Sequence, residues 1–95
     1  MPFSTLKNAK ERLQGYSFSP DLLAVEISEN REKCIVAVSA YILPSMSEEE
    51  KEEIDCYFTE VIADYPHPYK LEEDIVEVLS ISSSEIKGDI VFFRG

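Results

Sequence analysis

The stretch from Ser45 to Tyr65 constrains the fold most strongly, because its apolar residues can be buried together only on one side of a helix. They recur at i, i+3, i+4, i+7, i+8 and i+11, which is one broad stripe of an α-helix. These residues are Ile54, Tyr57, Phe58, Val61, Ile62 and Tyr65. Ser47 and Glu50 have the spacing of an N-terminal capping box, and Pro66 ends the helix. We therefore expect an amphipathic helix that lies on a sheet.

Two β-rich segments precede this helix and differ in pattern. Residues 22–28 alternate apolar with polar side chains, which is the period of a half-buried strand. Residues 34–43 are apolar almost without interruption, so we expect a central strand, covered on both faces, that contains Cys34 as a small buried residue. The polar residues 29–32 predict a hairpin turn, in which Asn30 is best suited to a positive φ.

The segment over residues 70–80 is compatible with either a helix or a strand. Some of its apolar residues have helical spacing, but those from Ile75 to Ile81 are rich in β-branched side chains and alternate in character. We predict a strand from about Asp74, then a serine-rich loop, then a last strand over residues 89–94. A helix in the first of these segments would instead give a three-stranded sheet with three helices.

A further helix is predicted before the strands, capped by Ser4 or Thr5 and ended by Gly15. The order is then helix, hairpin, helix, hairpin. We predict an α+β fold of αββαββ order, in which a four-stranded, mainly antiparallel sheet is packed by two helices. Both helices on one face would bury every apolar stripe; opposite faces are the alternative, because the central strand is apolar on both sides. The chain fits a single compact domain over residues 1–95.

Charge is the unusual property of the composition. There are 19 Asp and Glu against 9 Lys and Arg, for a net charge of −10. The first twenty residues carry +2, which leaves −12 for residues 21–95. A field of this sign repels nucleic acid and anionic lipid and attracts basic protein surfaces. Solubility alone is the other explanation of the acidity.

The sequence contains few of the residues that catalysis or metal binding requires. It has one histidine, three glycines and two cysteines. A nucleophile–base–acid group, a glycine-rich phosphate loop and a zinc site each need more of these residues at suitable spacing. The acids of residues 48–53 lack the alternating ligands and the glycine of a calcium loop. We expect a protein that is not an enzyme and that holds no cofactor or metal.

The compartment is predicted from the cysteines and from the hydropathy. Cys34 and Cys56 are too few for the disulfide framework of a small secreted fold. The first residues lack a basic and then apolar leader, and no apolar run approaches the about 18 residues of a membrane-spanning helix. We therefore predict a reduced, cytoplasmic protein without membrane association.

The function that fits this profile is neutralisation of a basic protein partner, such as a nuclease or a nucleic-acid-binding protein. In size, charge and lack of catalytic residues the chain resembles small bacterial immunity proteins in general. The class includes immunity proteins, antitoxins and nucleic-acid-mimic inhibitors, none of which binds nucleic acid directly in this role. The predicted contacts are acids on the helix and in a second patch after it: Glu49, Glu52, Glu53, Glu60, Glu72, Glu73 and Asp74.

The alternative is a structural or regulatory subunit that forms homo-oligomers through apolar surface. Tyr16, Phe18 and the apolar residues 90–93 motivate it, since the last of these would form an edge strand that needs covering. Acidity would then serve solubility only.

Overall fold

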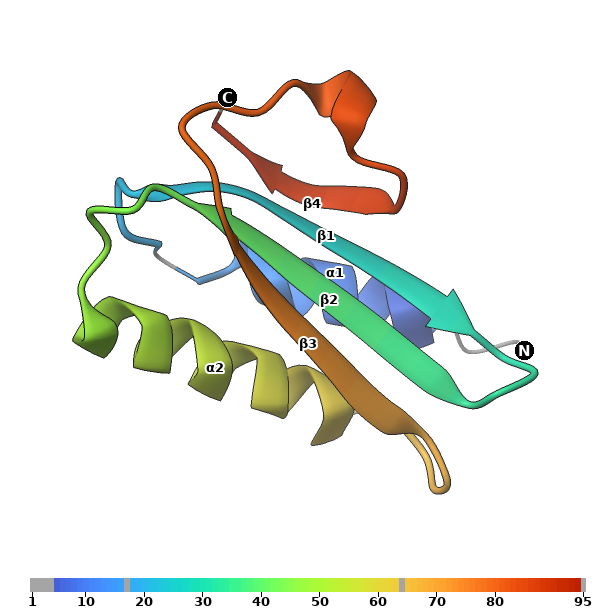
Figure 1. The fold of residues 1–95 in the computed structure, drawn as a ribbon. Helices are drawn as coiled ribbons and strands as arrows, with labels where there is room; N and C mark the ends of the chain where they lie inside the picture. The colour runs from blue at the N-terminus through green and yellow to red at the C-terminus, as the bar shows by residue number, and fades with distance from the viewer. Residues whose placement is uncertain (1–4, 17, 64, 95) are drawn as a thin grey trace.

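The computed structural model describes residues 5–16, 18–63 and 65–94, and the elements occur there in the predicted αββαββ order (Figure 1). In this part of the chain they are α1 (Thr5–Gln14), β1 (Leu22–Asn30), β2 (Ile35–Ile42), α2 (Glu48–Ala63), β3 (Lys70–Glu77), a short 3-10 turn η1 (Ser83–Glu85) and β4 (Asp89–Phe93). Ser4, one of the two predicted caps of α1, lies outside the described residues.

The sheet of the described residues has four strands in the order β3-β2-β1-β4 and is mixed, so the prediction of a mainly antiparallel sheet is confirmed in part. β1 pairs antiparallel with β2 and with β4, but β2 and β3 are parallel. The predicted second hairpin is therefore wrong, since β3 and β4 lie at opposite edges. The reason is the connection: α2 runs back along the sheet, so the chain re-enters beside the start of β2 and continues in the same direction.

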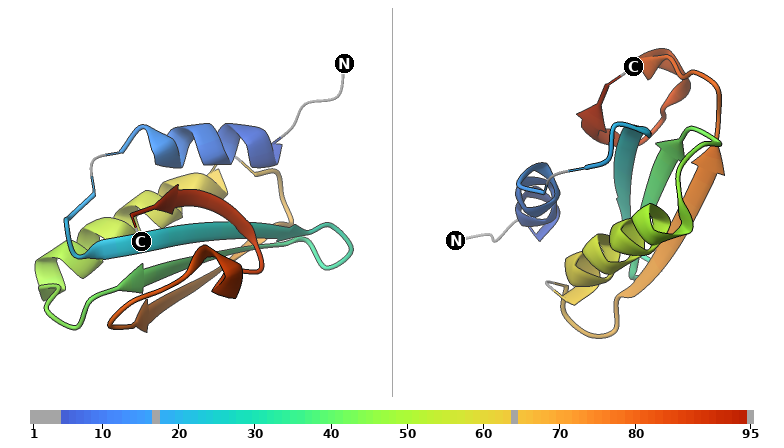
Figure 2. Two further views of the ribbon diagram at one scale, coloured as in Figure 1. Left: turned by 90° about the horizontal axis from the view of Figure 1, so that it is seen from above. Right: turned by 90° about the vertical axis from the view of Figure 1, so that its left-hand side faces the viewer.

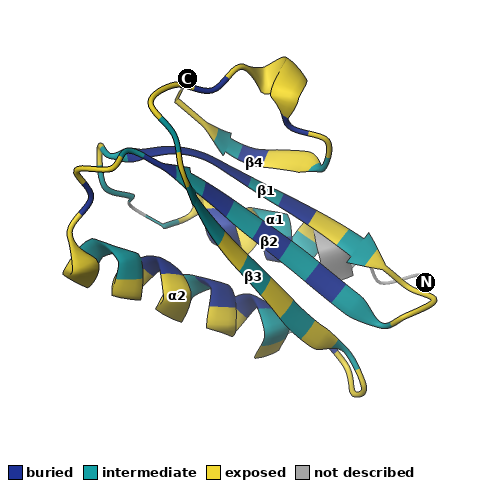
Figure 3. Ribbon diagram, in the orientation of Figure 1, coloured by how far each residue is buried: buried dark blue, intermediate teal, exposed yellow. Residues whose placement is uncertain are grey.

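Both helices pack on one face of the sheet (Figure 2, right). The core beneath them is made of apolar side chains from both helices and from alternate positions of the central strands: Ala9, Leu13, Ile54, Phe58, Val61, Val25, Ile27, Val36, Val38 and Ala40. Every second residue of β2 is buried, as the alternating colours along this strand show (Figure 3). The amphipathic stripe of α2 is thus confirmed as core.

A second, smaller apolar cluster lies on the opposite face. Ile81 and Ile86, from the segment between β3 and β4, cover Leu23 and Ala24 of β1. Because this segment covers only one end of the sheet, the face over the other half of β2 stays open.

Glu26 of β1 attaches this covering segment to the sheet. Its carboxylate accepts a hydrogen bond from the Tyr41 hydroxyl and another from the Gly88 backbone N–H, at 2.7 Å. Burial and this contact raise the pKa of Tyr41 to about 12, the hydrogen bond to Glu26 being the larger cause. Glu26 is therefore a structural residue.

β3 is a strand, as predicted, but it begins at Lys70 and not near Asp74. The Lys70 N–H donates to the Cys34 carbonyl at 2.9 Å, and the Val78 N–H donates to the Ile42 carbonyl at 2.8 Å. Parallel pairing along β2 thus sets both ends of β3. After β3 the chain leaves the sheet, and Ile81 and Ile86 cover the opposite face, whereas Leu79 is exposed.

Cys34 is not the buried start of a strand. It ends the turn between β1 and β2, is partly exposed, and has a positive φ of 55°, which the sequence had suggested for Asn30. Asn30 instead accepts a hydrogen bond from the Lys33 N–H through its side chain, at 3.1 Å. The left-handed residue that reverses the chain comes at the last position of this turn.

Candidate partner-binding surface

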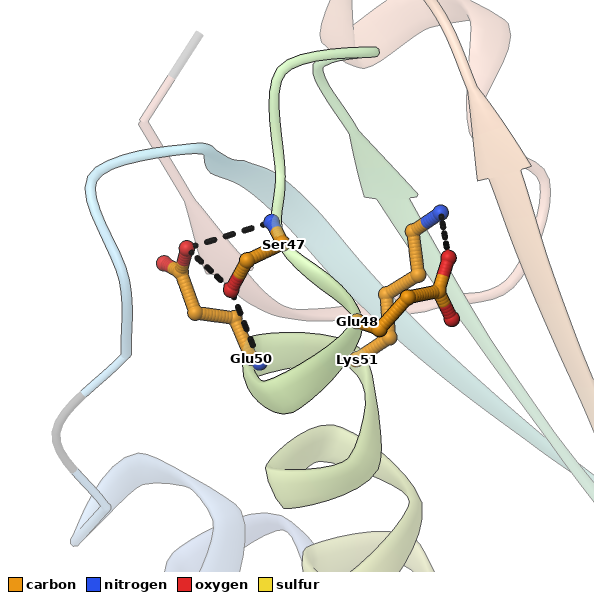
Figure 4. Close-up of polar contacts among 4 residues, drawn as sticks. All are labelled: Ser47, Glu48, Glu50 and Lys51. Carbon is orange, nitrogen blue, oxygen red and sulfur yellow. Dashed lines mark hydrogen bonds and ion pairs between the residues drawn. The ribbon is translucent and has the colours of Figure 1, made fainter.

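α2 begins with the predicted capping box (Figure 4). The Glu50 N–H donates to the Ser47 hydroxyl at 3.2 Å, and the Ser47 N–H donates to the Glu50 carboxylate at 3.2 Å. Hydrogen bonds from Ser19 and Ser47 hold the pKa of Glu50 below its ordinary value. Glu50 therefore stabilises the helix start and is not a free surface charge.

Three predicted contacts, Glu49, Glu52 and Glu53, are exposed. Helical spacing puts them on the side of α2 opposite its buried residues Ile54, Phe58 and Val61. Within the described ranges none of the three forms an ion pair or a side-chain hydrogen bond. Cys56 lies exposed on the same side. This side of α2 thus presents carboxylates that no side chain of the described chain neutralises.

Glu60, also a predicted contact, has an internal partner. Its carboxylate accepts a hydrogen bond from the Tyr16 hydroxyl, and the Tyr16 ring stacks on Tyr57 with centroids 4.1 Å apart. Burial, and then the Glu60 carboxylate, raise the pKa of Tyr16. The structure therefore places Glu60 in the contact between the α1 end and α2.

The three predicted acids of β3 lie on two different faces, because successive side chains of a strand point in opposite directions. Glu72 and Asp74 are paired in register with Ala37 and Ser39 and are exposed on the open face of the sheet. Glu73 points to the helix side. The second patch expected from the sequence is thus divided by the edge of the sheet.

Glu73 meets Asp55 of α2 on the helix side. Burial, and then a hydrogen bond between the two carboxyl groups, raise the pKa of Glu73 to about 7. Asp55 was missed by the sequence analysis, because nothing local indicates that it approaches residue 73. The pair joins the acids of α2 to those of β3. We call Glu52, Asp55, Glu72, Glu73 and Asp74 the acidic edge.

The open face of the sheet is hollowed beside this edge. A hollow of about 820 Å³ lies over the hairpin end of β1 and β2, and a second of about 470 Å³ lies over β2 and β3. Both are lined by Ala37 and Glu72, so they adjoin. We call them together the sheet trough. In the sequence, the trough corresponds to short residues at positions of β1 and β2 that point to the open face: Ser28, Ala37 and Ser39.

The described residues show neither a metal-binding cluster nor a membrane-spanning helix. In that part of the chain no three His, Cys, Asp or Glu residues are grouped so that they could hold a metal ion. Nor is any helix there both long and apolar enough to cross a membrane.

Comparison with known families identifies the kind of partner. A family model described as MafI2 immunity protein matches residues 17–95. The chain belongs to the MafI2 immunity protein family. No curated protein matches it at the level required for a relative. Family membership indicates the role of an immunity protein, an inhibitor that binds a toxin.

The family model matches most of this immunity protein. The matched range includes α2, all strands of the described sheet, the acidic edge and the sheet trough, and it leaves out α1. α1 is nevertheless attached to this unit by an ion pair between Lys10 and Asp89 of β4, at 2.9 Å. The candidate surface thus belongs to the family domain itself.

Proposed function

We propose that this immunity protein neutralises its toxin by binding a basic surface of that toxin with the acidic edge and the exposed acids of α2. A toxin that acts on nucleic acid needs such a surface for the phosphate backbone. Carboxylates on the immunity protein would take the place of phosphates and block the site. Inhibition of this kind requires no catalysis by the immunity protein.

The observation that carries this proposal is the set of exposed acids without an internal cation. Within the described residues Glu49, Glu52, Glu53, Glu72 and Asp74 are exposed and form no ion pair. A net charge of about 2–8 suffices for the solubility of a small domain. The net charge of −10 exceeds that range, and like charges repel one another in the folded state. A basic partner would relieve this repulsion.

Charge complementarity also suits the task of an inhibitor. It accelerates encounter by about 10- to 1000-fold at low salt, which lets an immunity protein capture a toxin before the toxin reaches its substrate. We place this encounter in the cytoplasm. The free thiols of Cys34 and Cys56 are compatible with a reducing compartment.

The test is the rate of association with the toxin recovered by pull-down with this protein from its native source, measured at 50 and 500 mM salt. We expect the rate to fall about tenfold or more with salt, and to fall similarly in a Glu49→Lys/Glu52→Lys variant at low salt. The matched control is Glu11→Lys/Glu85→Lys, which makes the same charge change at exposed sites away from the acidic edge. Affinity that ignores both salt and the first variant would refute a charge-driven mechanism.

Self-association is a second candidate, favoured by apolar side chains at the β4 edge. Ile90 and Phe93 are each 41% exposed. Tyr16 and Phe18, in contrast, pack within the monomer against Tyr57. A dimer through β4 would appear in sedimentation equilibrium at micromolar concentration and would dissociate in an Ile90→Lys variant; a monomer throughout would dismiss it.

A further inference from the structure

We propose that an extended basic segment of the toxin lies in the sheet trough, across Ala37 and Ser39, with two cationic side chains against Glu72 and Asp74. This inference rests on the proposed function, since it takes the toxin as the partner. It adds a second face that the toxin covers, reached from α2 around the β3 edge of the sheet, and it names the chemistry of the segment that covers it.

The first step is that this face lacks a cover of its own. Both helices pack on the other side of the sheet, and the segment between β3 and β4 reaches only the end of β1 around Leu23 and Ala24 (Figure 2). The two adjoining hollows occupy the part that remains. A face of this kind is available to a second chain without any rearrangement of the immunity protein.

The second step concerns the floor of the trough. Ser28, Ala37 and Ser39 present short side chains where larger ones would fill the space. Neither serine hydroxyl makes a hydrogen bond to another part of the described chain, so both can bond to a partner. A floor of short side chains with free hydroxyls leaves room for the side chains and the backbone of an extended polypeptide segment.

The third step concerns charge. Glu72 and Asp74 stand along one side of the trough, exposed and without a cation among the described residues. They are two positions apart on one strand, so their Cα atoms are roughly 6.6 Å apart. Side chains at alternate positions of an extended segment have the same spacing. Two Lys or Arg residues separated by one residue would therefore match both carboxylates.

The charges at the hairpin end indicate where along the trough the basic part of the segment lies. Lys33 and Lys70 are exposed there against the exposed acid Glu32, while the nearby Arg31 is already paired with Glu29 at 2.7 Å. This end favours a neutral or acidic part of the segment. The basic pair belongs over the middle of β3 and not over the turn.

The experiment fills the trough without changing its charge. Ala37→Trp and Ser39→Trp are compared with Gln14→Trp, an exposed position on α1 outside the family range, for binding to the toxin recovered by pull-down from the native source. We expect at least tenfold weaker binding for the first two and unchanged binding for the third, with thermal unfolding followed to establish folding. Wild-type affinity in both trough variants, or an equal loss in the control, would overturn the inference.

A second measurement avoids bulky residues. In a variant with Cys34→Ser and Cys56→Ser, the thiol of a Ser39→Cys substitution is labelled with and without saturating toxin. We expect labelling to slow at least tenfold in the complex, and equal rates would overturn the inference. If the trough is uncovered but binding still weakens with salt and with Glu49→Lys/Glu52→Lys, the proposed function stands and only this face is wrong. If salt and charge reversal have no effect, the proposed function itself fails.

Discussion

The carboxyl groups of Asp55 on α2 and Glu73 on β3 meet across the junction between the helix layer and the edge of the sheet. Burial and this contact raise the pKa of Glu73 to about 7, whereas a carboxyl group of an unfolded chain titrates near 4.5. Two carboxyl groups in contact are thus built into the surface that we assign to the toxin. Ionisation of Glu73 in this contact should lower the free energy of unfolding of the protein by a measurable amount.

The sign of this cost follows from linkage. Because the folded state holds its proton more tightly, stability falls as pH rises from about 4.5 to about 7 and the penalty is complete above the folded pKa. A Glu73→Gln variant should therefore be more stable than wild type at pH 8, by on the order of 1 kcal/mol after allowance for solvent screening. In a domain of this size that raises the unfolding midpoint by about 4–8 °C.

Thermal unfolding at pH 4 and pH 8 checks this prediction. The gain in Glu73→Gln should be absent at pH 4, where the carboxyl group is protonated in both states. Glu72→Gln is the matched control, because its side chain points to the open face, away from Asp55. A gain of equal size at both pH values would show that the carboxyl pair is not its source.

The close approach of Gly88 to Glu26 leads to a second prediction. A Cβ atom at Gly88 would lie 2.7 Å from the Glu26 carboxylate and 3.1 Å from the Ile27 carbonyl. The carboxylate cannot move away without losing its bonds to Tyr41 and to the Gly88 N–H. Gly88→Ala should therefore destabilise the fold by about 1–3 kcal/mol, measured by urea unfolding.

Gly15 supplies the control for this substitution. A Cβ atom there would lie 3.4 Å from the Arg12 carbonyl, which is ordinary contact. Gly15→Ala should accordingly change stability by much less than Gly88→Ala. Equal effects of the two variants would mean that the crowding at Glu26 is not responsible.

The contact between Tyr16 and Glu60 leads to a third prediction, which separates stability from binding. Tyr16→Phe removes the hydrogen bond to Glu60 and should cost about 0.5–1 kcal/mol of stability, with toxin affinity unchanged. Glu52→Gln should have the opposite profile, with unchanged stability and weaker binding at low salt. Calorimetric unfolding and titration of the toxin measure both quantities. Weaker toxin binding by Tyr16→Phe would contradict this prediction and would indicate that the region around Tyr16 and Glu60 contacts the toxin.

Local signals allowed α2 and the first two strands to be predicted. The capping box of Ser47 and Glu50 and the apolar stripe that follows depend on residues within a few turns of each other. The pairing of β3 could not be predicted in the same way. Its register, such as Val36 opposite Leu71, is set by the path of the chain through α2 and not by the residues of β3 themselves.

The sequence predicted which acids the candidate surface contains, but not which of them contact residues distant in the sequence. Exposure of Glu49, Glu52 and Glu53 follows from the stripe on the other side of the helix, and the structure agrees with it. Glu60 is instead held by the Tyr16 hydroxyl, 44 positions away in the sequence, and no local pattern predicts this hydrogen bond. Predicting the trough would have required the strand order as well, because β3 extends the open face of the sheet beside β2.

Cys56 is a natural reporter of whether the toxin covers the outer side of α2. Its thiol is exposed and free, on the same side of the helix as Glu49, Glu52 and Glu53. In a Cys34→Ser variant, which leaves it the single thiol, we expect saturating toxin to slow its labelling about tenfold or more. The free protein at the same salt concentration is the reference, and a variant with Glu49→Lys/Glu52→Lys should lose the protection in proportion to its loss of binding. Labelling of Cys56 that stays as fast in a saturated complex would remove this side of α2 from the contact and leave the acidic edge around β3 as the site of charge-driven binding.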